Sequence, residues 1–321
     1  MDYITKIDSL KNIIDKELLN LINNDYVLLD VPYHYNIGDV LIWNGELEFL
    51  KQLPYKHLNF GYYYQNFKIT DNTIILLHGG GNFGDLWRGF QDYRLEIISK
   101  YPNNKIVVFP QTVYYQHDNN MKADSQLMSR HKNLTICARD TKSYSILKEN
   151  FQNNILLVPD MAFYMSIKKL KKYILREGEK NLFLKRNDKE LLLSTFHADS
   201  ESFDVLDWPT EDGTLELYCM WDNYLLKTYR RCDRRKYLKK IAPFFKGLND
   251  LYIHTLLRNK ITKIGVGFVS KYKSIYSTRL HTAILGLMIN KKVVFFDNTY
   301  GKNKNFYNSW LTDLNIIKMI P

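Results

Sequence analysis

The chain has 321 residues, of which 45% are hydrophobic and 25% charged, and its 45 Lys+Arg against 34 Asp+Glu give a net charge of +11. These values exclude intrinsic disorder, because enough apolar surface exists to offset the conformational entropy of the chain. The positive charge favours three kinds of partner: nucleic acid, an anionic membrane surface, or a phosphorylated or carboxylated substrate. At about 150 residues per domain, the length predicts two domains.

Targeting signals and cysteine spacing narrow the class of protein. No apolar run approaches the roughly 18 residues of a membrane span, and residues 1–19 carry acids and lysines where a signal peptide has its apolar core. We therefore expect a cytoplasmic protein. Cys137, Cys219 and Cys232 lie far apart without CxxC spacing, which argues against a disulfide framework and a Cys-based zinc site.

The first half of the chain alternates helices and short buried strands. Apolar residues at three- and four-residue spacing predict a helix over 3–22. Strands are expected at 26–31, 57–60, 73–77, 105–109, 134–138 and 155–158, and helices at 39–50, 89–100, 120–131 and 140–150, the last capped by Asp140. This alternation predicts a parallel sheet covered on both faces, with ligands at the carboxyl ends of its strands.

A second alternating block follows a basic connector at 166–180. Strands are expected at 181–185, 191–195, 263–266, 274–278 and 292–296, and helices within 213–258 and at 280–289 and 304–318. We therefore expect two α/β domains, residues 1–170 and 171–321, with a cleft between them. The last helix is expected to pack back on the first domain, and the aromatic and basic segment 300–307 is placed to close over the cleft.

The first candidate motif is Asn36-Ile37-Gly38-Asp39, which opens a helix after the first strand. Gly38 permits a tight turn, and the N-terminus of the helix offers free N–H groups to an anion or a hydroxyl. The alternative is that Asp39 only caps the helix.

The second motif places Gly79, Gly80, Gly81 and Asn82 directly after a buried strand and ends at Asp85. Consecutive glycines let a ligand approach the backbone, and Asp85 is a candidate base or acceptor of a sugar hydroxyl. The run matches neither GxGxxG nor GxxxxGK[ST], so it indicates neither a dinucleotide site nor a P-loop. A tight packing turn is the alternative interpretation.

The third motif, Ser277 to His281, lies where a strand gives way to a helix. Arg279 offers a planar fork for phosphate or carboxylate, and His281, two residues on, can exchange a proton near neutral pH on the same side. Arg186, at another strand end, is a candidate second cation that Asp188 would hold. The alternatives are an Arg–carboxylate strut for Arg279 and a solvated charged loop for Arg186.

Other patterns are largely negative. No His/Asp/Glu cluster has metal-ligand spacing, no DxD motif stands out, and no nucleic-acid module is matched, so we expect neither a metal nor a nucleic-acid partner. The basic run at 230–240 is either a solvated helix face or a contact for anionic lipid headgroups.

Taken in order, five short motifs resemble those of the polysaccharide pyruvyl transferases over residues 30–310. They are N-I-G-D (36–39), G-G-G-N-F-G-D (79–85), A-R-D-x-x-S (138–143), P-D-M-A (159–162) and S-T-R-L-H (277–281). The resemblance implies two Rossmann-like domains arranged as in GT-B glycosyltransferases. It also implies transfer of a pyruvyl group from phosphoenolpyruvate to a sugar, such as galactose, of a polyprenyl-diphosphate-linked precursor of capsular or exopolysaccharide. The product would be a cyclic ketal, and no cofactor would be needed.

The resemblance also implies roles for single residues. Arg279 and His281 match the Arg-x-His that binds phosphoenolpyruvate, and Arg186 matches a further arginine of that donor site in the second domain. Asp85 matches the aspartate that ends the glycine motif. Either Asp85 or Asp39 would take the proton of the acceptor hydroxyl.

The acceptor side would then lie in the first domain. Its residues would be Asn36, Gly38, Gly79, Gly80, Gly81 and Asn82. The enzyme would work at the inner face of the cytoplasmic membrane, in peripheral contact with anionic lipid. Two alternatives remain: a GT-B glycosyltransferase that uses a nucleotide sugar, and a non-catalytic protein that binds glycan or membrane.

Overall fold

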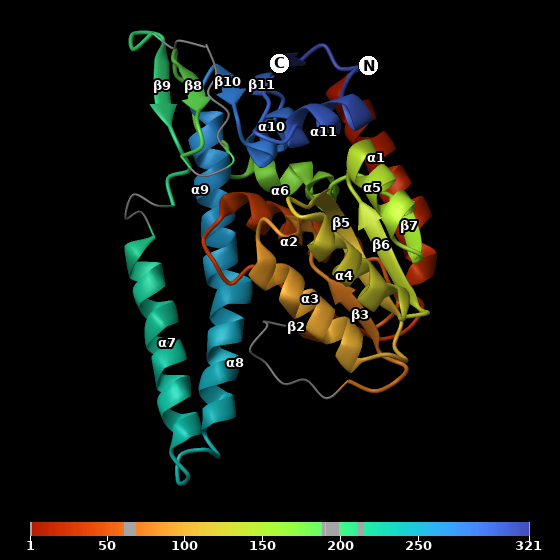
Figure 1. The fold of residues 1–321 in the computed structure, drawn as a ribbon. Helices are drawn as coiled ribbons and strands as arrows, with labels where there is room; N and C mark the ends of the chain where they lie inside the picture. The colour runs from red at the N-terminus through yellow and green to blue at the C-terminus, as the bar shows by residue number, and fades with distance from the viewer. Residues whose placement is uncertain (1, 61–68, 188–189, 191–198, 211–214, 321) are drawn as a thin grey trace.

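The computed structural model describes residues 2–60, 69–187, 190, 199–210 and 215–320, and it contains two sheets flanked by helices (Figure 1). All strand pairs among these residues are parallel. The protein therefore has a mixed α/β fold with parallel sheets. The domain boundary near residue 170 and the GT-B-like arrangement stay predictions.

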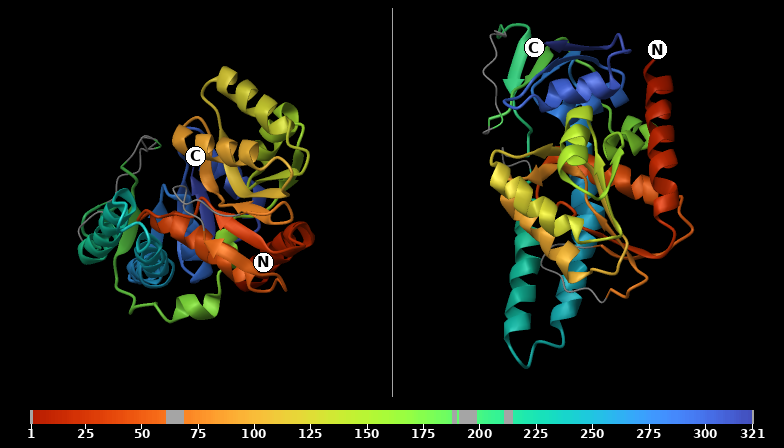
Figure 2. Two further views of the ribbon diagram at one scale, coloured as in Figure 1. Left: turned by 90° about the horizontal axis from the view of Figure 1, so that it is seen from below. Right: turned by 45° about the vertical axis from the view of Figure 1, so that its right-hand side comes forward.

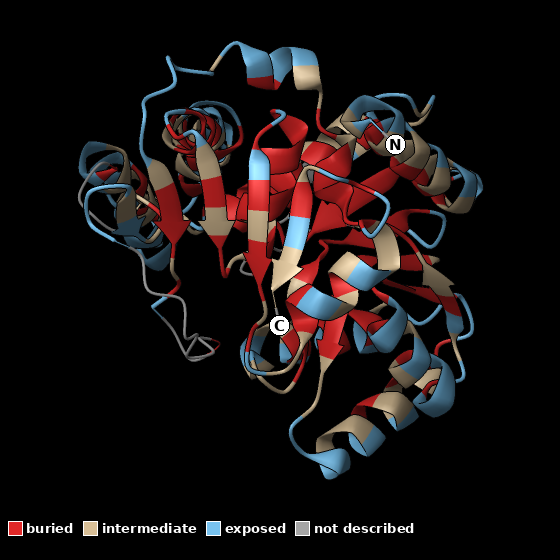
Figure 3. Cartoon of the chain, turned by 90° about the horizontal axis from the view of Figure 1, so that it is seen from above, coloured by how far each residue is buried: buried red, intermediate tan, exposed pale blue. Residues whose placement is uncertain are grey.

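The first sheet has the strand order β2-β1-β3-β5-β6-β7, and β4 pairs with β5 beside this path. Its strands are β1 Tyr26–Leu29, β2 His57–Phe60, β3 Ile74–Leu77, β4 Gly80–Gly84, β5 Ile106–Tyr114, β6 Leu134–Ala138 and β7 Asn154–Leu157. Neighbouring residues of a strand face different cores: Leu28 lies in the cluster with α1 and α2, whereas Val27 and Leu29 lie in the cluster with α3 and α5. Burial on both faces explains the continuous apolar runs (Figure 3).

Helices cover both faces of this sheet. They are α1 Tyr3–Leu18, α2 Ile37–Leu50, α3 Arg88–Lys100, α4 Asp118–Ser129 and α5 Thr141–Asn150, followed by α6 Ile167–Lys171, with short 3₁₀ turns η1 Leu19–Leu21 and η2 Met161–Tyr164. Asp140 caps α5 as predicted, because its carboxylate accepts the N–H of Ser143.

The second sheet has the order β12-β11-β10-β8-β9. Its strands are β8 Asn181–Leu184, β9 Phe203–Leu206, β10 Ser274–Ser277, β11 Lys292–Phe296 and β12 Ile317–Ile320, and the helices beside it are α9 Arg258–Ser270, α10 Leu280–Met288 and α11 Lys302–Trp310. One apolar cluster runs from α1 and α2 through to α10 and β11, so the two halves share a core. The last helix contacts α5, and the indole N–H of Trp310 donates to the carbonyl of Arg139 at 2.7 Å.

A helical hairpin extends away from both sheets. It consists of α7 Glu216–Arg234 and α8 Ala242–Tyr252, which lie side by side in both views of Figure 2. A π-helical turn, η3 Ile253–Leu257, joins α8 to α9. The prediction of a largely helical segment at 213–258 is thus confirmed over the described residues.

Several sequence predictions differ from the structure. Residues 263–266 belong to α9, where Ile261, Gly265 and Val269 are buried at helical spacing, and the predicted helix at 304–318 ends at Trp310 and gives way to β12. Strand β5 continues through Pro110, where its register with β6 shifts, so the proline does not end it. The strand predicted at 191–195 lies outside the described residues.

Candidate functional site

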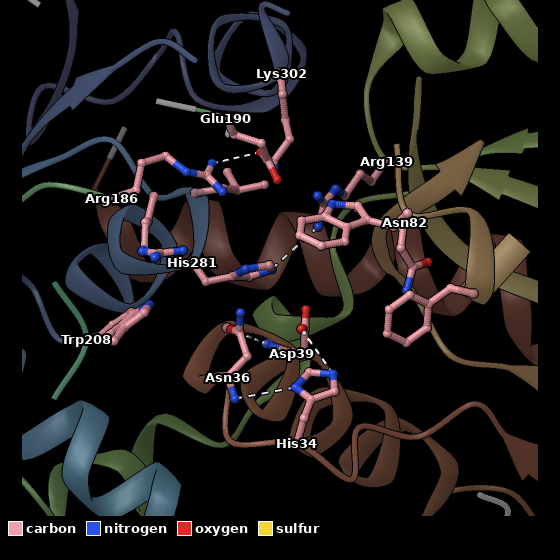
Figure 4. A pocket seen from close by; sticks show the side chains of 16 residues that line it. His34, Asn36, Asp39, Asn82, Arg139, Arg186, Glu190, Trp208, His281 and Lys302 are labelled. Carbon is pink, nitrogen blue, oxygen red and sulfur yellow. Dashed lines mark hydrogen bonds and ion pairs between the residues drawn. The ribbon is translucent and has the colours of Figure 1, made fainter. Parts of the chain in front are cut away.

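A cavity of about 530 Å³ lies between the two halves, at the carboxyl ends of their strands (Figure 4). Strand β4 and the segments that follow β1, β4, β6, β8, β9, β10 and β11 supply its walls. Its polar lining residues are His34, Asn36, Asp39, Asn82, Arg139, Arg186, Glu190, Arg279, His281 and Lys302, accompanied by Gly38, Gly81, Leu280 and the aromatic residues Trp87, Phe90 and Trp208.

The loop before α2 forms one wall of the cavity. Asn36 is the cap of α2, since its side-chain oxygen accepts the N–H of Asp39 at 3.3 Å, so the interpretation of Asp39 as the cap is wrong. The Asp39 carboxylate lies 3.5 Å from His34 Nε2. A Cβ at Gly38 would come within 2.5 Å of His281 Nδ1. Glycine is therefore what lets the histidine of the other half approach this turn.

The opposite wall brings together the two arginines that the sequence singled out. Arg279 precedes α10 and donates through Nε and Nη2 to both carboxylate oxygens of Asp207, each at 2.5 Å. Arg186 follows β8 and pairs through Nη1 with Glu190 at 2.7 Å. Both side chains line the same cavity, and their carboxylate partners fix the planes of the two guanidinium groups. Asp188 lies outside the described residues.

His281 belongs to a buried group that bridges the two halves. Its Nε2 lies 3.4 Å from Asp160 Oδ2 and 3.4 Å from Arg139 Nη1, while Arg139 Nη1 donates to the same Asp160 oxygen at 2.7 Å. Burial alone would raise the pKa of Asp160, but the charges and hydrogen bonds of His281 and Arg139 hold that pKa below its usual range. An ionised Asp160 thus orients the imidazole that faces the cavity.

Arg139 and Lys302 also line the cavity, although the sequence analysis assigned neither a site role of its own and placed Lys302 only within the segment 300–307 expected over the cleft. Arg139 is fully buried, Nε donates to Thr112 at 2.8 Å, and Nη2 has no hydrogen-bond partner among the described residues. A Cβ at Gly81 would meet this Nη2 at 2.9 Å and Lys302 Nζ at 3.3 Å. Glycine at this position therefore lets the backbone of β4 lie close to both cations.

Glu190 balances part of this positive charge. Its Oε2 accepts from Lys302 Nζ at 3.1 Å and from Tyr300 at 2.9 Å, and it also pairs with Arg186. Burial lowers the pKa of Lys302, and the positive charges of Arg139 and Arg186 lower it further. The negative charge of Glu190 acts in the opposite direction but does not reverse the shift. Burial would raise the pKa of Glu190, but Lys302 and Arg186 hold it below its usual range. Besides His281, the cavity is thus lined by four cationic side chains and by two carboxylates, Asp39 and Glu190.

The structure does not bring every predicted residue to the cavity. Asp85 accepts the backbone N–H groups of Gln116 at 2.7 Å and His117 at 2.9 Å, and it is not among the lining residues. It anchors the end of β5. Gly79 donates its N–H to buried Glu46 at 2.8 Å, and Gly80 is likewise not a lining residue. Asn36, Gly38, Asp39, Gly81 and Asn82 do line the cavity.

The glycine motif has a different structure from the predicted turn. Gly80 to Gly84 form strand β4, with Gly80 and Gly84 at φ values of 137° and 118° that favour glycine. A Cβ at Gly84 would lie 1.9 Å from the carbonyl oxygen of Tyr114. The motif therefore serves both packing against β5 and, at Gly81, access to the cavity.

No group of three or more His, Cys, Asp or Glu residues is arranged to hold a metal ion within the part of the chain described. Over the same residues, no helix has the length and apolar character needed to cross a membrane.

Comparisons with known proteins identify the family. The family model for polysaccharide pyruvyl transferase matches residues 36–300. The chain is 30% identical to EpsO of Bacillus subtilis (strain 168), whose name assigns it provisionally to the pyruvyl transferases, over 98% of this chain and 92% of that protein. It is 23% identical to pyruvyl transferase 1 of Schizosaccharomyces pombe (strain 972 / ATCC 24843), over 88% of this chain and 69% of that one.

A solved structure supports the fold. A functionally uncharacterized protein of Klebsiella pneumoniae subsp. pneumoniae NTUH-K2044 superposes with a TM-score of 0.60 at 20% identity, covering 97% of this chain and 98% of that chain. The family match spans the cavity residues from Asn36 to the Arg279–His281 segment, and His34 and Lys302 lie just outside it. The chain therefore belongs to the polysaccharide pyruvyl transferase family.

Proposed function

We propose that this protein transfers a pyruvyl group from phosphoenolpyruvate to a sugar and forms a cyclic ketal with two of its hydroxyl groups. One observation carries the proposal: Arg139, Arg186, Arg279 and Lys302 surround one cavity, with His281 among them. Phosphoenolpyruvate bears a phosphate and a carboxylate, so it needs more than one cationic group, and arginine binds both anions through paired N–H donors.

The chemistry assigns a proton donor and a proton acceptor. His281 protonates the methylene carbon of phosphoenolpyruvate, which makes C2 electrophilic, with oxocarbenium character. A sugar hydroxyl then adds to C2 and gives its proton to Asp39, the cavity carboxylate on the wall opposite Arg279. The C2–O bond to phosphate breaks and phosphate leaves. A second hydroxyl then adds to C2 and gives its proton to His281, which the first proton transfer left neutral. The fixed cations stabilise the negative charge that develops on the leaving phosphate.

The acceptor side adjoins the donor cavity. A second cavity of about 370 Å³ shares Trp87 and Phe90 with the first and is also lined by Asp30 and Tyr93. Aromatic faces and a carboxylate suit a sugar ring, because the apolar side of the ring stacks and its hydroxyls donate hydrogen bonds. We assign this region to a hexose such as galactose on a polyprenyl-diphosphate-linked polysaccharide precursor, at the inner face of the cytoplasmic membrane. The two halves would act as lobes of a GT-B-like pair.

The test is phosphate release from phosphoenolpyruvate with candidate acceptor glycans, together with the mass increase of one pyruvyl ketal on the acceptor. Arg279→Ala and His281→Ala should each reduce the rate by at least ~100-fold, the lower end of an acid–base contribution. Lys168→Ala, a change at an exposed lysine of α6, serves as the control. Wild-type rates in both cavity variants would remove the assignment. Thermal stabilisation by a nucleotide sugar and none by phosphoenolpyruvate would instead favour a glycosyltransferase.

A further inference from the structure

The hairpin of α7 and α8 exposes large apolar side chains at helical spacing. On α7 these include Leu217, Trp221 and Tyr224, with Trp221 59% exposed, and on α8 they include Phe244, Leu248 and Leu251. Residues spaced by three, four and seven positions share one face of a helix. Each helix therefore carries an apolar stripe that the described part of the protein leaves open to solvent.

Both stripes lie on the side of the hairpin away from the body. On α7, Asp222 accepts a hydrogen bond from Tyr35 at 3.2 Å, and on α8, Asp250 accepts one from Tyr33 at 2.8 Å. At 100° per residue, the apolar positions lie from about 100° (Trp221, Leu251) to about 160° (Tyr224, Leu248) around each helix from these contacts, so the stripes face away from them. The two stripes thus form one outward surface, which we call the hairpin face.

Positive charge gathers at the far end of this hairpin. Residues 230–240 contain seven Arg or Lys and one Asp, and these basic side chains are exposed. An aromatic side chain, Tyr237, lies within this basic run and is 75% exposed. Apolar and aromatic residues beside a basic cluster match the headgroup region of an anionic bilayer in both polarity and charge.

We propose that the hairpin face and its basic tip dock the protein on an anionic lipid surface. Charge complementarity favours lipid over a second copy of the chain, because a second copy would bring another equally positive tip. The docking does not depend on the identity of the donor or the acceptor, so it stands or falls separately from the pyruvyl transfer.

Docking would also affect one wall of the cavity. Tyr33 and Tyr35, which hold the hairpin, flank His34 and precede Asn36, and both His34 and Asn36 line the cavity. The loop that carries this wall is therefore tied to the base of the hairpin. An acceptor whose lipid tail stays in the bilayer would then bind beside the cavity wall formed by this loop, which the docked hairpin holds in place.

The experiment is flotation of the full chain with vesicles of phosphatidylcholine alone and of phosphatidylcholine with phosphatidylglycerol, without any substrate. We expect binding only to the anionic vesicles, weakened by added salt. Substituting Arg231, Arg234 and Arg235 by Gln should lower the partition coefficient at least about tenfold. Replacing Lys168 and Lys171 of α6 and Lys172, which follows it, by Gln removes equal charge elsewhere and should leave binding nearly unchanged.

The apolar part needs its own variant. Trp221→Ser with Leu248→Ser should also lower partition at least about tenfold, since both side chains lie on the hairpin face and are exposed without lipid. A blue shift of tryptophan fluorescence on anionic vesicles should be smaller in Trp221→Phe, a change that keeps the fold and the apolar surface.

Four results would overturn the proposal. They are binding that survives both hairpin changes, a loss as large in the α6 control, a fluorescence shift unchanged in Trp221→Phe, and a dimer by light scattering that needs the hairpin face while vesicles are not bound.

Discussion

At the scale of single residues, the site depends on cations that are buried but not fully used by the protein. Arg139 is held by Asp160 and Thr112 through two of its nitrogens, yet Nη2 points to the space beside Gly81 without a partner among the described residues. A buried N–H donor without a partner costs free energy, so we expect this atom to gain an acceptor when the donor substrate binds. A phosphate or carboxylate oxygen meets that need.

Lys302 gives the sharpest test at this scale. Lys302→Gln removes one cation but leaves Glu190 paired with Arg186, so the fold should persist. We expect the KM for phosphoenolpyruvate to rise at least about tenfold, the effect of losing one charge-assisted hydrogen bond. Lys304→Gln, at an exposed position of the same helix, is the matched control. An equal KM in the Lys302 variant and the control would show that Lys302 does not contact the donor.

The strongest sequence predictions at the residue scale concern positions at strand ends. Arg186, Arg279 and His281 follow β8 and β10 directly, and the carboxyl edge of a parallel sheet is where ligands bind, so the pattern was sufficient to place them together. Arg139 and Asp160 lie in motifs that supported the family resemblance. The sequence does not show that these two side chains pair with each other, because the pairing depends on tertiary contacts. Asp85 shows the converse, since its motif position suggested chemistry and its contacts are with backbone N–H groups.

At the scale of elements, buried strands were predictable and strands of unusual composition were not. The apolar runs of β1, β3 and β6 are buried on both faces, and such continuous runs are typical of strands inside a parallel sheet. Strand β4 is rich in glycine, which strands disfavour, so composition indicated a turn. Residues 263–266 form a short apolar run, and such a run does not distinguish a strand from one turn of a buried helix such as α9.

Strand β4 yields the second prediction. Gly81→Ala adds a Cβ 2.9 Å from Arg139 Nη2 and 3.3 Å from Lys302 Nζ, so both cations must shift away from the space for the anion. We expect weaker donor binding, seen as a several-fold higher KM, with little loss of stability, because the only close contacts are ends of side chains. Gly89→Ala in α3 meets nothing within 4 Å and should leave KM unchanged. A KM equal to that of the wild type in Gly81→Ala would place the anion elsewhere.

Gly84 tests the packing role of the same strand. Its φ of 118° disfavours any side chain, and a Cβ would lie 1.9 Å from the Tyr114 carbonyl oxygen. Gly84→Ala should therefore destabilise the protein by roughly 1–3 kcal/mol, measured by urea unfolding. If the free energy of unfolding does not fall, the close approach of β4 and β5 at this point is not required.

At the scale of the whole molecule, the site is also the junction of the two halves. Asp160 follows the first sheet and meets His281 of the second half, while Trp310 of α11 donates to the carbonyl of Arg139. A donor that contacts cations from both halves binds only when they are together. Binding should therefore stabilise the assembled molecule in proportion to the logarithm of donor concentration.

The pH dependence of stability is the last prediction. The pKa values of Asp160 and Glu190 lie below their usual range in the folded protein, because nearby cations outweigh the effect of burial. The unfolded chain therefore takes up protons first, and the stability from these carboxylates, complete above their unfolded pKa values near 4, is lost as pH falls below that range. Asp160→Asn should lower the free energy of unfolding at neutral pH, because Arg139 loses its buried partner.

The matched comparison is Asp8→Asn, at an exposed position of α1. The difference in the free energy of unfolding between wild type and Asp160→Asn should shrink as pH falls below about 4, since protonation removes the same charge from the wild type. The Asp8 variant should follow the wild-type curve throughout. A difference for Asp160→Asn that stays constant from neutral to acid pH would mean that the pKa of this carboxyl is the same in the folded and the unfolded protein. The stabilisation of its ionised form by His281 and Arg139 would then be ruled out.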